Sequence, residues 1–351
     1  MSEILSPRFF LEKAITLPLL DVRAPLEFEK GHIPGAKNIP FLSNEERARV
    51  GLTYKQEGRR AAILLGLELV GPRMRNIAES IEEYAGDKRE LCLYCARGGM
   101  RSENAAWLAE LLDYTIFRLE GGYKSFRNDL LKGMEQKQSI IILSGMTGSG
   151  KTDVLKVLAS QGEQVIDLEG LAHHKGSAFG SMGQAPQLPQ QNFENKLGLE
   201  WKNLETKRIV WIENESMRIG KNAIPEEIWT QMREAPVIAI SMPRHLRVQR
   251  LIPEYGSFEV ENLEKAIQSI SKRLGPQYSK EVIEALHRGE VGECFDLLLE
   301  HYYDKAYQYS LKKRSPESIH HVETDSPNPE VNAEKVLSFA KEMFFSDFSE
   351  V

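Results

Sequence analysis

Short apolar runs alternate with amphipathic stretches along most of the chain. The runs within 17–23, 91–94, 139–144 and 236–242 are bounded by Gly, Pro or charged residues, which is typical of buried strands. Between them, apolar residues recur every three or four positions, as they do within 263–274, which predicts helices. Strands that alternate with helices predict an α/β protein whose sheets are parallel.

The same pattern divides the chain into parts. Residues 1–131 are predicted to form one α/β domain, and the polar segment 132–138 is predicted to be a linker. A second parallel-sheet domain is expected over 139–243, followed by a helical C-terminal region over 244–351 that packs on it. Within the first domain, residues 44–86 have a helical pattern and are predicted to be an insertion.

A cysteine loop follows the first domain's central apolar run. Cys95 comes directly after 91–94, and the helical pattern resumes at Ser102. Loop N–H groups, a helix N-terminus and two guanidinium groups would together favour negative charge around the sulfur. We therefore predict that Cys95 is a catalytic nucleophile inside an anion-binding loop. The loop residues assigned to the anion are Arg97, Gly98, Gly99 and Arg101.

Two other interpretations of this cysteine remain open. A cysteine at the end of a strand is often only a small buried hydrophobic residue. Five residues separate Cys95 from Arg101, a spacing that also suits a cysteine phosphatase loop, although Tyr94 stands where such phosphatases usually carry histidine.

A complete phosphate-binding loop follows the apolar run 139–144. Residues 145–152 read Gly-Met-Thr-Gly-Ser-Gly-Lys-Thr, and a helical pattern continues after them. Glycines let backbone N–H groups surround phosphate oxygens, the lysine neutralises them, and the threonine hydroxyl can reach a metal ion. The residues assigned to phosphate binding are Gly145, Thr147, Gly148, Ser149, Gly150, Lys151 and Thr152.

Other polar residues are weaker candidates. Asp167 and Glu213 each follow an apolar run and are candidate acids of the phosphate pocket. The Gly-rich segment 170–183 is long enough to be a functional lid. His173 and His174 have no third ligand nearby, so no metal site is predicted there. The helical spacing of Arg244, Arg247 and Arg250 suits the phosphates of a substrate or of RNA.

Composition limits the class of protein. The 351 residues are 41% hydrophobic and 27% charged, which is ordinary for a globular protein, and no apolar run is long enough to span a membrane. Three cysteines cannot form a disulfide framework, and the first residues lack the pattern of a secretory signal, so we expect a cytoplasmic protein. The net charge of −6 argues against a surface coated for nonspecific nucleic-acid binding.

Three landmarks of the first domain resemble rhodaneses. They are the Asp21-x-Arg23 strand end, the Gly-His-Ile-Pro-Gly-Ala-x-Asn turn at 31–38 and the Cys95 loop. The resemblance implies that Cys95 carries sulfur or selenium as a persulfide or perselenide. This loop has one residue more before Arg101 than many rhodanese loops, so it could hold a larger tetrahedral anion.

The whole chain resembles the tRNA 2-selenouridine synthase family. The resemblance rests on the Cys95 loop, on 145–152, on 165–177 and on 212–216, and it implies a rhodanese domain followed by a P-loop NTPase-like domain. The family acts on the wobble uridine of certain tRNAs and exchanges the sulfur of 2-thiouridine for selenium from selenophosphate. Its members also attach a geranyl group from geranyl diphosphate to that sulfur, giving an S-geranyl intermediate.

The resemblance also implies roles for the site residues. Cys95 would attack the selenium of selenophosphate, while Arg97 and Arg101 stabilise the leaving phosphate. Loop 145–152 would bind the diphosphate of geranyl diphosphate, with Trp211 or Phe179 near the hydrocarbon chain. The sequence leaves open whether this loop requires Mg²⁺ or binds a nucleotide instead.

Alternative functions come from other classes. An ATP-dependent tRNA sulfurtransferase would use a rhodanese persulfide and consume ATP on each turnover. A regulatory protein would use the phosphate-binding loop to switch a non-catalytic rhodanese domain, although inactive rhodanese domains often lose the cysteine. A cysteine phosphatase would cleave a generic phosphoester.

Overall fold

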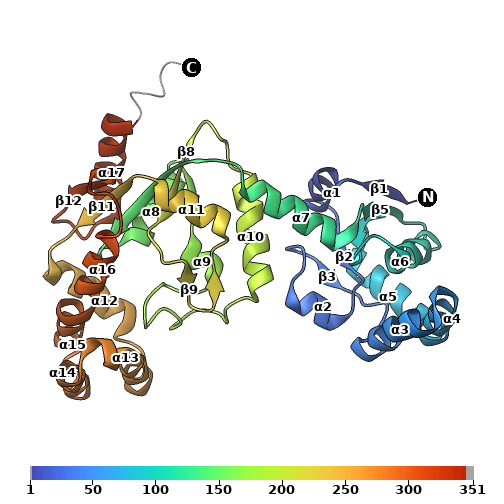
Figure 1. Ribbon diagram of the computed structural model, residues 1–351, viewed down its shortest axis with the longest axis horizontal. Helices are drawn as coiled ribbons and strands as arrows, with labels where there is room; N and C mark the ends of the chain where they lie inside the picture. The colour runs from blue at the N-terminus through green and yellow to red at the C-terminus, as the bar shows by residue number, and fades with distance from the viewer. Residues whose placement is uncertain (1, 345–351) are drawn as a thin grey trace. The chain divides into compact units, whose positions relative to one another are not determined.

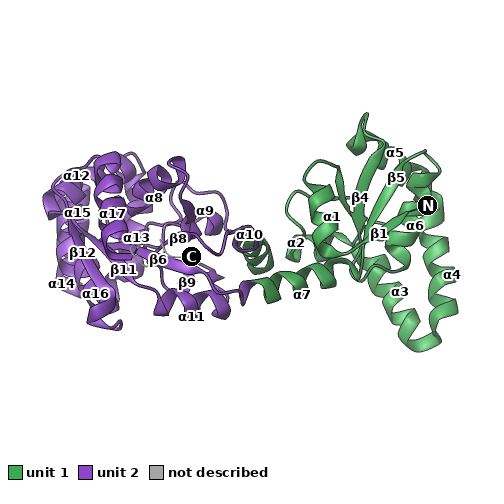
Figure 2. Cartoon of the chain, turned by 90° about the horizontal axis from the view of Figure 1, so that it is seen from above, with its two compact units in different colours: residues 1–133, 189–199 green, residues 134–188, 200–351 purple. Residues whose placement is uncertain are grey.

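The structure is a computed structural model that describes residues 2–344. The chain divides into two compact units, residues 1–133 with 189–199 and residues 134–188 with 200–351 (Figure 2). The sequence predicts a linker at 132–138, but helix α7 (Gly122–Met134) extends into it. The end of the expected C-terminal region, 345–351, lies outside the described residues.

Unit 1 is built on a sheet in which every strand pairing is parallel. The strand order is β1-β5-β4-β2-β3. The carboxyl ends of β2 and β4 are paired side by side, so the segments that follow these two strands begin at the same edge of the sheet. The strands are β1 (Glu3–Leu5), β2 (Leu19–Asp21), β3 (Lys37–Asn38), β4 (Glu90–Tyr94) and β5 (Thr115–Leu119).

Helices of unit 1 enclose this sheet unequally. Helices α5 and α6 bury Ile81 and Ala105 in one core with Leu93 of β4. Helix α3 buries no residue and α4 buries only Ala62, so this helical pair contributes little to that core. The helices that precede α7 are α1 (Pro7–Ala14), α2 (Pro25–Lys30), α3 (Asn44–Glu57), α4 (Arg59–Val70), η1 (Gly71–Arg73), α5 (Met74–Ala85) and α6 (Met100–Glu110).

A segment expected in the second domain belongs to unit 1. Residues 189–199 contain the first part of α10 (Gln190–Lys202). Asn195 donates to the carbonyl of His32 at 2.7 Å and accepts from Arg127 at 2.8 Å. The assignment of all of 139–243 to the second domain therefore differs from the structure at these residues.

Unit 2 has a second parallel sheet, with the order β12-β11-β6-β8-β7. Its strands are β6 (Ser139–Gly145), β7 (Gln164–Ile166), β8 (Ile209–Glu213), β11 (Val237–Ser241) and β12 (Ile319–Glu323). Strand β12 lies within the region predicted to be helical and pairs with β11 at the sheet edge. A short antiparallel pair, β9 (Arg218–Ile219) and β10 (Asn222–Ala223), lies apart from this sheet.

Helices of unit 2 form two clusters, which can be followed in Figure 1. Helices α8 and α17 pack on the sheet through Leu155 and Val336. The segment from α12 to η2 forms a separate apolar core that includes Ile267 and Phe295. The helices that lie wholly within unit 2 are α8 (Lys151–Ser160), α9 (Leu168–Ala172), α11 (Glu226–Glu234), α12 (Arg244–Tyr255), α13 (Val260–Leu274), α14 (Pro276–His287), α15 (Val291–Leu298), η2 (Leu299–Tyr303), α16 (Asp304–Leu311), η3 (Pro316–Ser318) and α17 (Pro329–Phe344).

The predicted fold class is confirmed. Both units are α/β with parallel sheets, and the chain after β11 is mostly helical. Each candidate loop joins the carboxyl end of a strand to the start of a helix. The Cys95 loop joins β4 to α6, and loop 145–152 joins β6 to α8.

Candidate functional site

Cys95 lies at the base of its loop and is almost completely buried, with 3% of its surface exposed. Its Sγ lies 3.2 Å from the hydroxyl oxygen of Ser102 and 3.8 Å from the carbonyl oxygen of Gly99. The sulfur's described partners are therefore a hydroxyl and a carbonyl, rather than the inward-pointing N–H groups that the sequence predicts.

The start of α7 fixes the backbone of this loop. The amides of Tyr123 and Lys124 donate to the carbonyls of Cys95 and Ala96 at 2.8 and 3.1 Å. Gly122 has φ +60°, and a Cβ there would collide with Cys95 O and lie 2.6 Å from the amide nitrogen of Gly98. Only glycine allows this approach, so Gly122, to which the sequence analysis assigns no role, is required by the Cys95 loop.

The backbone conformation of the loop requires glycine at only one of the two positions 98 and 99. Gly98 has φ +68°, a backbone conformation that favours glycine. Gly99 has φ −97°, and a Cβ built on it meets nothing within 4 Å. The left-handed backbone conformation therefore makes glycine necessary at position 98 but not at position 99.

The two arginines assigned to the anion also differ. Arg101 forms an ion pair with Glu27 of α2, with Nη1 2.6 Å from Oε2. Arg97 is exposed and forms no ion pair with any of the residues described. A bound anion would therefore compete with Glu27 for Arg101, whereas Arg97 is free to receive it.

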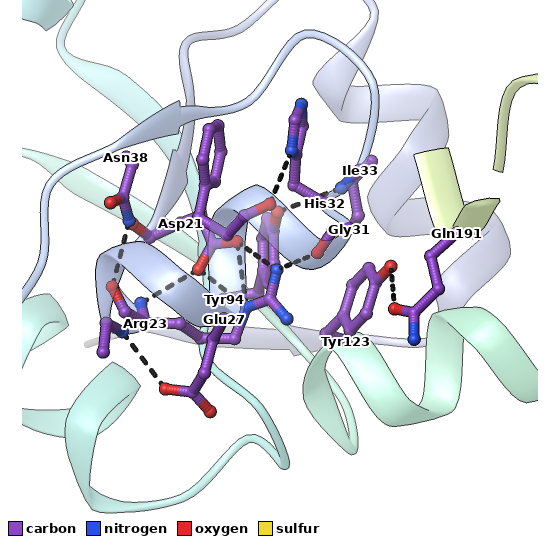
Figure 3. Close-up of polar contacts among 12 residues, drawn as sticks. Asp21, Arg23, Glu27, Gly31, His32, Ile33, Asn38, Tyr94, Tyr123 and Gln191 are labelled. Atoms are coloured by element: carbon purple, nitrogen blue, oxygen red, sulfur yellow. Dashed lines mark hydrogen bonds and ion pairs between the residues drawn. The ribbon is translucent and has the colours of Figure 1, made fainter. Parts of the chain in front are cut away.

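Buried polar contacts explain the first two rhodanese landmarks (Figure 3). Asp21 at the end of β2 accepts two hydrogen bonds from the Arg23 Nε, at 3.0 and 2.9 Å. The Arg23 guanidinium also donates to the carbonyl of Gly31 at 2.6 Å and lies 3.9 Å from the ring centroid of Tyr123. These residues fix the 31–38 turn against the sheet, so the Asp21-x-Arg23 strand end has a structural role.

His32 has a structural role in the 31–38 turn. Its ring stacks on Phe28, with 3.8 Å between centroids, and its Nδ1 hydrogen-bonds the Phe28 carbonyl at 2.9 Å. Its backbone amide donates to Asn192 at 2.9 Å. The histidine therefore orders the turn and the start of α10.

In unit 2, loop 145–152 is wrapped as a phosphate-binding loop. Gly148 and Gly150 have φ +82° and +79°. Lys151 Nζ donates to the carbonyl of Gly145 at 3.0 Å, so its charge lies across the loop. The hydroxyl of Ser149 is buried and has no partner among the described residues. An anion in the cavity beside this loop would meet the Lys151 cation, whereas the buried Ser149 hydroxyl does not line that cavity.

The three arginines of α12 are paired with carboxylates. Arg247 is buried, binds both oxygens of Asp304 at 2.8 Å and donates to the carbonyl of Thr147 at 3.2 Å. Arg250 pairs with Asp153, and Arg244 pairs with Asp296 and Glu300. The predicted phosphate or RNA face is therefore wrong for Arg247, which instead supports the phosphate-binding loop.

Several acids gather behind Lys151 and Thr152. The Thr152 hydroxyl donates to Glu169 at 3.1 Å, and the Glu169 amide donates to the buried Glu213 carboxylate at 2.7 Å. Asp167 caps α9 by accepting from the amide of Gly170. Glu169 therefore contacts both the loop and Glu213. Of the two predicted pocket acids, Asp167 caps α9 and lines the cavity beside the loop, whereas Glu213 is buried and does not line it.

Burial makes these acids hard to ionise. Burial, then the charges of Glu169 and its neighbours, raises the pKa of Glu213 well above its usual range. Burial and the Glu169 charge raise the pKa of Glu215 to about 8, against the opposing charge of Lys151. Glu169 and Glu215 lie close enough to share a hydrogen bond and form a carboxyl pair beside the phosphate-binding loop.

A cavity of about 890 Å³ opens beside this loop. Trp211 is buried in the sheet core and Phe179 in the helical core, so neither lines the cavity as the sequence predicts. Four tyrosines from the helical region line it instead, and their positions were not predicted: Tyr255, Tyr302, Tyr303 and Tyr307.

Within residues 2–344, no group of three or more His, Cys, Asp or Glu side chains is placed to hold a metal ion. Thr152 and Glu169 supply adjacent oxygen atoms, the ligand type that Mg²⁺ prefers. No helix in that same range is long and apolar enough to cross a membrane.

Comparison with known proteins gives matches over both units. Residues 138–328 match the family model of the tRNA 2-selenouridine synthase AAA domain, and residues 10–129 match that of the rhodanese-like domain. A solved structure, the N-terminal domain of a Clostridium difficile 630 protein described as ATP/GTP binding, is 36% identical. It covers 37% of this chain and 99% of its own, with a TM-score of 0.34.

Curated relatives match nearly end to end. The tRNA 2-selenouridine synthase of Shewanella sediminis (strain HAW-EB3) is 39% identical, over 86% of this chain and 90% of its own. That of Shewanella woodyi (strain ATCC 51908 / MS32) is 37% identical over the same shares. With a rhodanese domain, a P-loop domain and relatives at this identity, the chain belongs to the tRNA 2-selenouridine synthase family.

Proposed function

We propose that this protein replaces the sulfur of wobble 2-thiouridine in tRNA with selenium, in two transfer steps. Its relatives are named for the synthesis of 2-selenouridine in tRNA. The observation that carries the proposal is a complete phosphate-binding loop that lines a cavity of about 890 Å³, room enough for a diphosphate and a hydrocarbon chain.

The first step is S-geranylation at loop 145–152. The thiocarbonyl sulfur forms a bond to C1 of geranyl diphosphate, and the C–O bond breaks with its electron pair leaving on diphosphate. The N3 proton of the base is released to solvent. Lys151 and the loop amides stabilise the charge that develops on the departing diphosphate.

The second step takes selenium from selenophosphate at the Cys95 loop. Selenium forms the bond to C2 of the base, and geranylthiol leaves with the electrons of the C–S bond and a proton. The Se–P bond must then break by phosphoryl transfer, which leaves 2-selenouridine and, after hydrolysis, phosphate. This sequence balances with one water and no oxidant.

This balance changes the role of Cys95. Selenophosphate carries selenium at the selenide level, so a perselenide on Cys95, which the rhodanese resemblance implies, would require an oxidant. We therefore propose that the Cys95 thiolate accepts the phosphoryl group, with Arg97 and Arg101 on its oxygens. The Ser102 hydroxyl, 3.2 Å from Sγ, would stabilise the thiolate when hydrolysis releases it.

Mg²⁺ is a proposed partner of the diphosphate. Thr152 and Glu169 would hold it, and the ion would neutralise diphosphate charge. Lys151, which also lines the cavity, would act on the diphosphate oxygens independently of the ion.

Two variants test the proposal separately. Purified protein is incubated with 2-thiouridine tRNA and with geranyl diphosphate, selenophosphate, both or neither, and the nucleosides are identified by mass spectrometry. Cys95→Ala should abolish selenouridine yet still form S-geranyl-2-thiouridine. Lys151→Ala should form neither from 2-thiouridine tRNA. Selenouridine formation at the full rate by Cys95→Ala would contradict the role of the cysteine.

An ATP-dependent sulfurtransferase is the alternative from another class. The same incubations with ATP replacing geranyl diphosphate discriminate the two. Turnover that consumes ATP stoichiometrically, with no geranylated nucleoside, would favour the alternative and overturn the first step.

A further inference from the structure

Three tyrosines near the phosphate-binding loop belong to one helical segment. Tyr302 and Tyr303 end η2, and Tyr307 lies one turn later in α16. All three line the cavity of about 890 Å³, as do Ala306 and Ser310 of the same segment. We call Tyr302, Tyr303 and Tyr307 the tyrosine wall.

The backbone is irregular where this wall begins. Element η2 is a π-helical turn between two α-helices, α15 and α16. Single π turns inside α-helices are rare and are frequently found at functional sites. Before the turn, Phe295 and Leu298 lie in the apolar core, and after it Tyr307 lines the cavity. Tyr302 and Tyr303, within the turn, pack against that core and also line the cavity. The rings of Tyr302 and Tyr303 meet edge to face, with 4.9 Å between centroids.

Two contacts fix the wall relative to the phosphate-binding loop. Asp304, between the wall residues, binds Arg247, which in turn donates to the carbonyl of Thr147 at 3.2 Å. The Tyr307 hydroxyl lies 3.1 Å from the hydroxyl of Ser144, at the end of β6. A ligand whose phosphates occupy the loop therefore meets the wall in a defined place.

The wall suits a hydrocarbon better than a nucleobase. A nucleobase presents hydrogen-bonding edges, but the Tyr307 hydroxyl is already engaged by Ser144, and the Tyr303 hydroxyl, which has no partner among the described residues, is buried. The neighbouring cavity residues Ala178, Leu251 and Ala306 offer methyl groups. Aromatic faces also attract cations, and an allylic diphosphate develops positive charge at C1 as its C–O bond breaks.

We propose that the tyrosine wall binds the hydrocarbon chain of the allylic diphosphate and that its ring faces stabilise the cation developing at C1. In that step the C–O electron pair leaves with diphosphate, and a sulfur lone pair of the thiouridine forms the new C–S bond. The inference rests on the proposed geranyl transfer. It assigns that reaction's chain specificity and part of its rate to Tyr302 and Tyr303.

Substitutions at Tyr302 separate the ring from the hydroxyl. Tyr302→Phe keeps the ring and should keep the single-turnover rate of tRNA geranylation within about threefold. Tyr302→Leu keeps apolar volume but loses the ring, and should lower this rate about tenfold. Both variants should bind inorganic diphosphate as the unaltered protein does. Tyr309→Leu is the matched control, because Tyr309 is 66% exposed on the same helix and is not among the cavity-lining residues.

Substitution at Tyr303 tests chain binding. Tyr303→Ala should weaken the binding of geranyl diphosphate about tenfold and leave that of inorganic diphosphate unchanged. Because dimethylallyl diphosphate has a shorter chain, Tyr303→Ala should weaken its binding less than it weakens the binding of geranyl diphosphate. The melting temperatures of both units are measured first in Tyr303→Ala. If this variant is unfolded, Tyr303→Leu replaces it in the binding measurements.

The outcomes distinguish this inference from the proposed function. If the unaltered protein transfers geranyl and every wall variant matches Tyr309→Leu, the wall inference is overturned and the proposed function stands. If the unaltered protein transfers no geranyl group, the proposed function itself fails. Variants that lose affinity for ATP but not for geranyl diphosphate would show a nucleobase site and overturn the inference.

Discussion

Arg101 of the cysteine loop is bound to Glu27, with 2.6 Å between Nη1 and Oε2. Glu27 also accepts from the amide of Ala24 at 3.1 Å, so the pair joins the start of α2 to the start of α6. Burial alone would raise the pKa of Glu27, but the hydrogen bond and charge of Arg101 hold the pKa below its usual value. The carboxylate therefore occupies the cation that a substrate anion would use.

Removal of this carboxylate charge should release Arg101. We expect Glu27→Gln to bind phosphate at the Cys95 loop about threefold to tenfold more tightly, since the competing anion is gone. It should also destabilise unit 1 by about 1–2 kcal/mol through the lost charged hydrogen bond. Phosphate titration and thermal unfolding measure the two effects. Glu29→Gln, at an exposed position of the same helix, is the control and should change neither quantity.

The dependence of unfolding stability on pH in the acid range should also reveal the Glu27–Arg101 ion pair. Because the folded pKa of Glu27 is lowered, its contribution is present above the ordinary value near 4.5 and is lost as pH falls through the folded value. Below that range Glu27→Gln and the unaltered protein should have similar melting temperatures. If the melting temperatures of Glu27→Gln and the unaltered protein differ by the same amount at pH 3 and at pH 7, the ion-pair explanation is contradicted.

Gly122 is required by the Cys95 loop and Gly99 is not. A Cβ at 122 would lie 2.6 Å from Gly98 N and 2.8 Å from Arg97 N, whereas a Cβ at 99 meets nothing within 4 Å. We expect Gly122→Ala to destabilise unit 1 by about 1–3 kcal/mol and to reduce selenouridine formation from S-geranyl tRNA. Gly99→Ala should change stability by less than about 0.5 kcal/mol. Equal unfolding midpoints for the two variants would contradict this.

Local motifs were predictable because their residues are adjacent in the chain. A strand, a glycine-containing loop and a helix within a few residues place Cys95 and Lys151 without knowledge of the rest of the fold. The unpredicted features join distant segments. No periodic pattern in the sequence indicates these features. They are the Arg247–Asp304 pair, the Glu169–Glu215 pair and the placement of 189–199 in unit 1.

Two other differences have local causes. Strand β12 is short and contains His320 and His321, so its apolar content is too low to predict an edge strand. Trp211 and Phe179 were assigned to the ligand cavity because they are large and lie near the motifs in sequence. Both point into cores, because a strand alternates its faces and a loop can bury an aromatic ring.

The buried arginine of α12 should matter more than its exposed neighbour. Arg247→Met leaves Asp304 without its partner and frees the Thr147 carbonyl, so we expect a loss of about 3–5 kcal/mol and weaker diphosphate binding. Arg244→Met removes the ion pair with Asp296, in which each side chain is about 40% exposed. It should lower the free energy of unfolding by less than about 1 kcal/mol. Urea unfolding and diphosphate titration measure both. A drop in tRNA affinity for Arg247→Met at unchanged stability would instead favour a role in RNA binding.

The Glu169–Glu215 pair should make stability depend on pH in the neutral range. Burial first, and then the Glu169 charge, raises the pKa of Glu215 to about 8, from an ordinary value of 4.5. The folded protein therefore keeps a proton that the unfolded chain loses. Stability from this group is complete below about pH 4.5 and is lost as pH rises towards about 8.

Glu215→Gln should remove this dependence, because the amide donates to Glu169 as the protonated carboxyl does but does not ionise. Relative to the unaltered protein, the variant should gain at least about 1 kcal/mol of stability between pH 5 and pH 9, with little further gain above. Thermal unfolding across this range measures the difference. Glu226→Gln, at an exposed position on α11, is the control and should show no such trend. A constant difference across the range would mean that Glu215 is ionised throughout, and that Lys151 rather than a shared proton neutralises the pair.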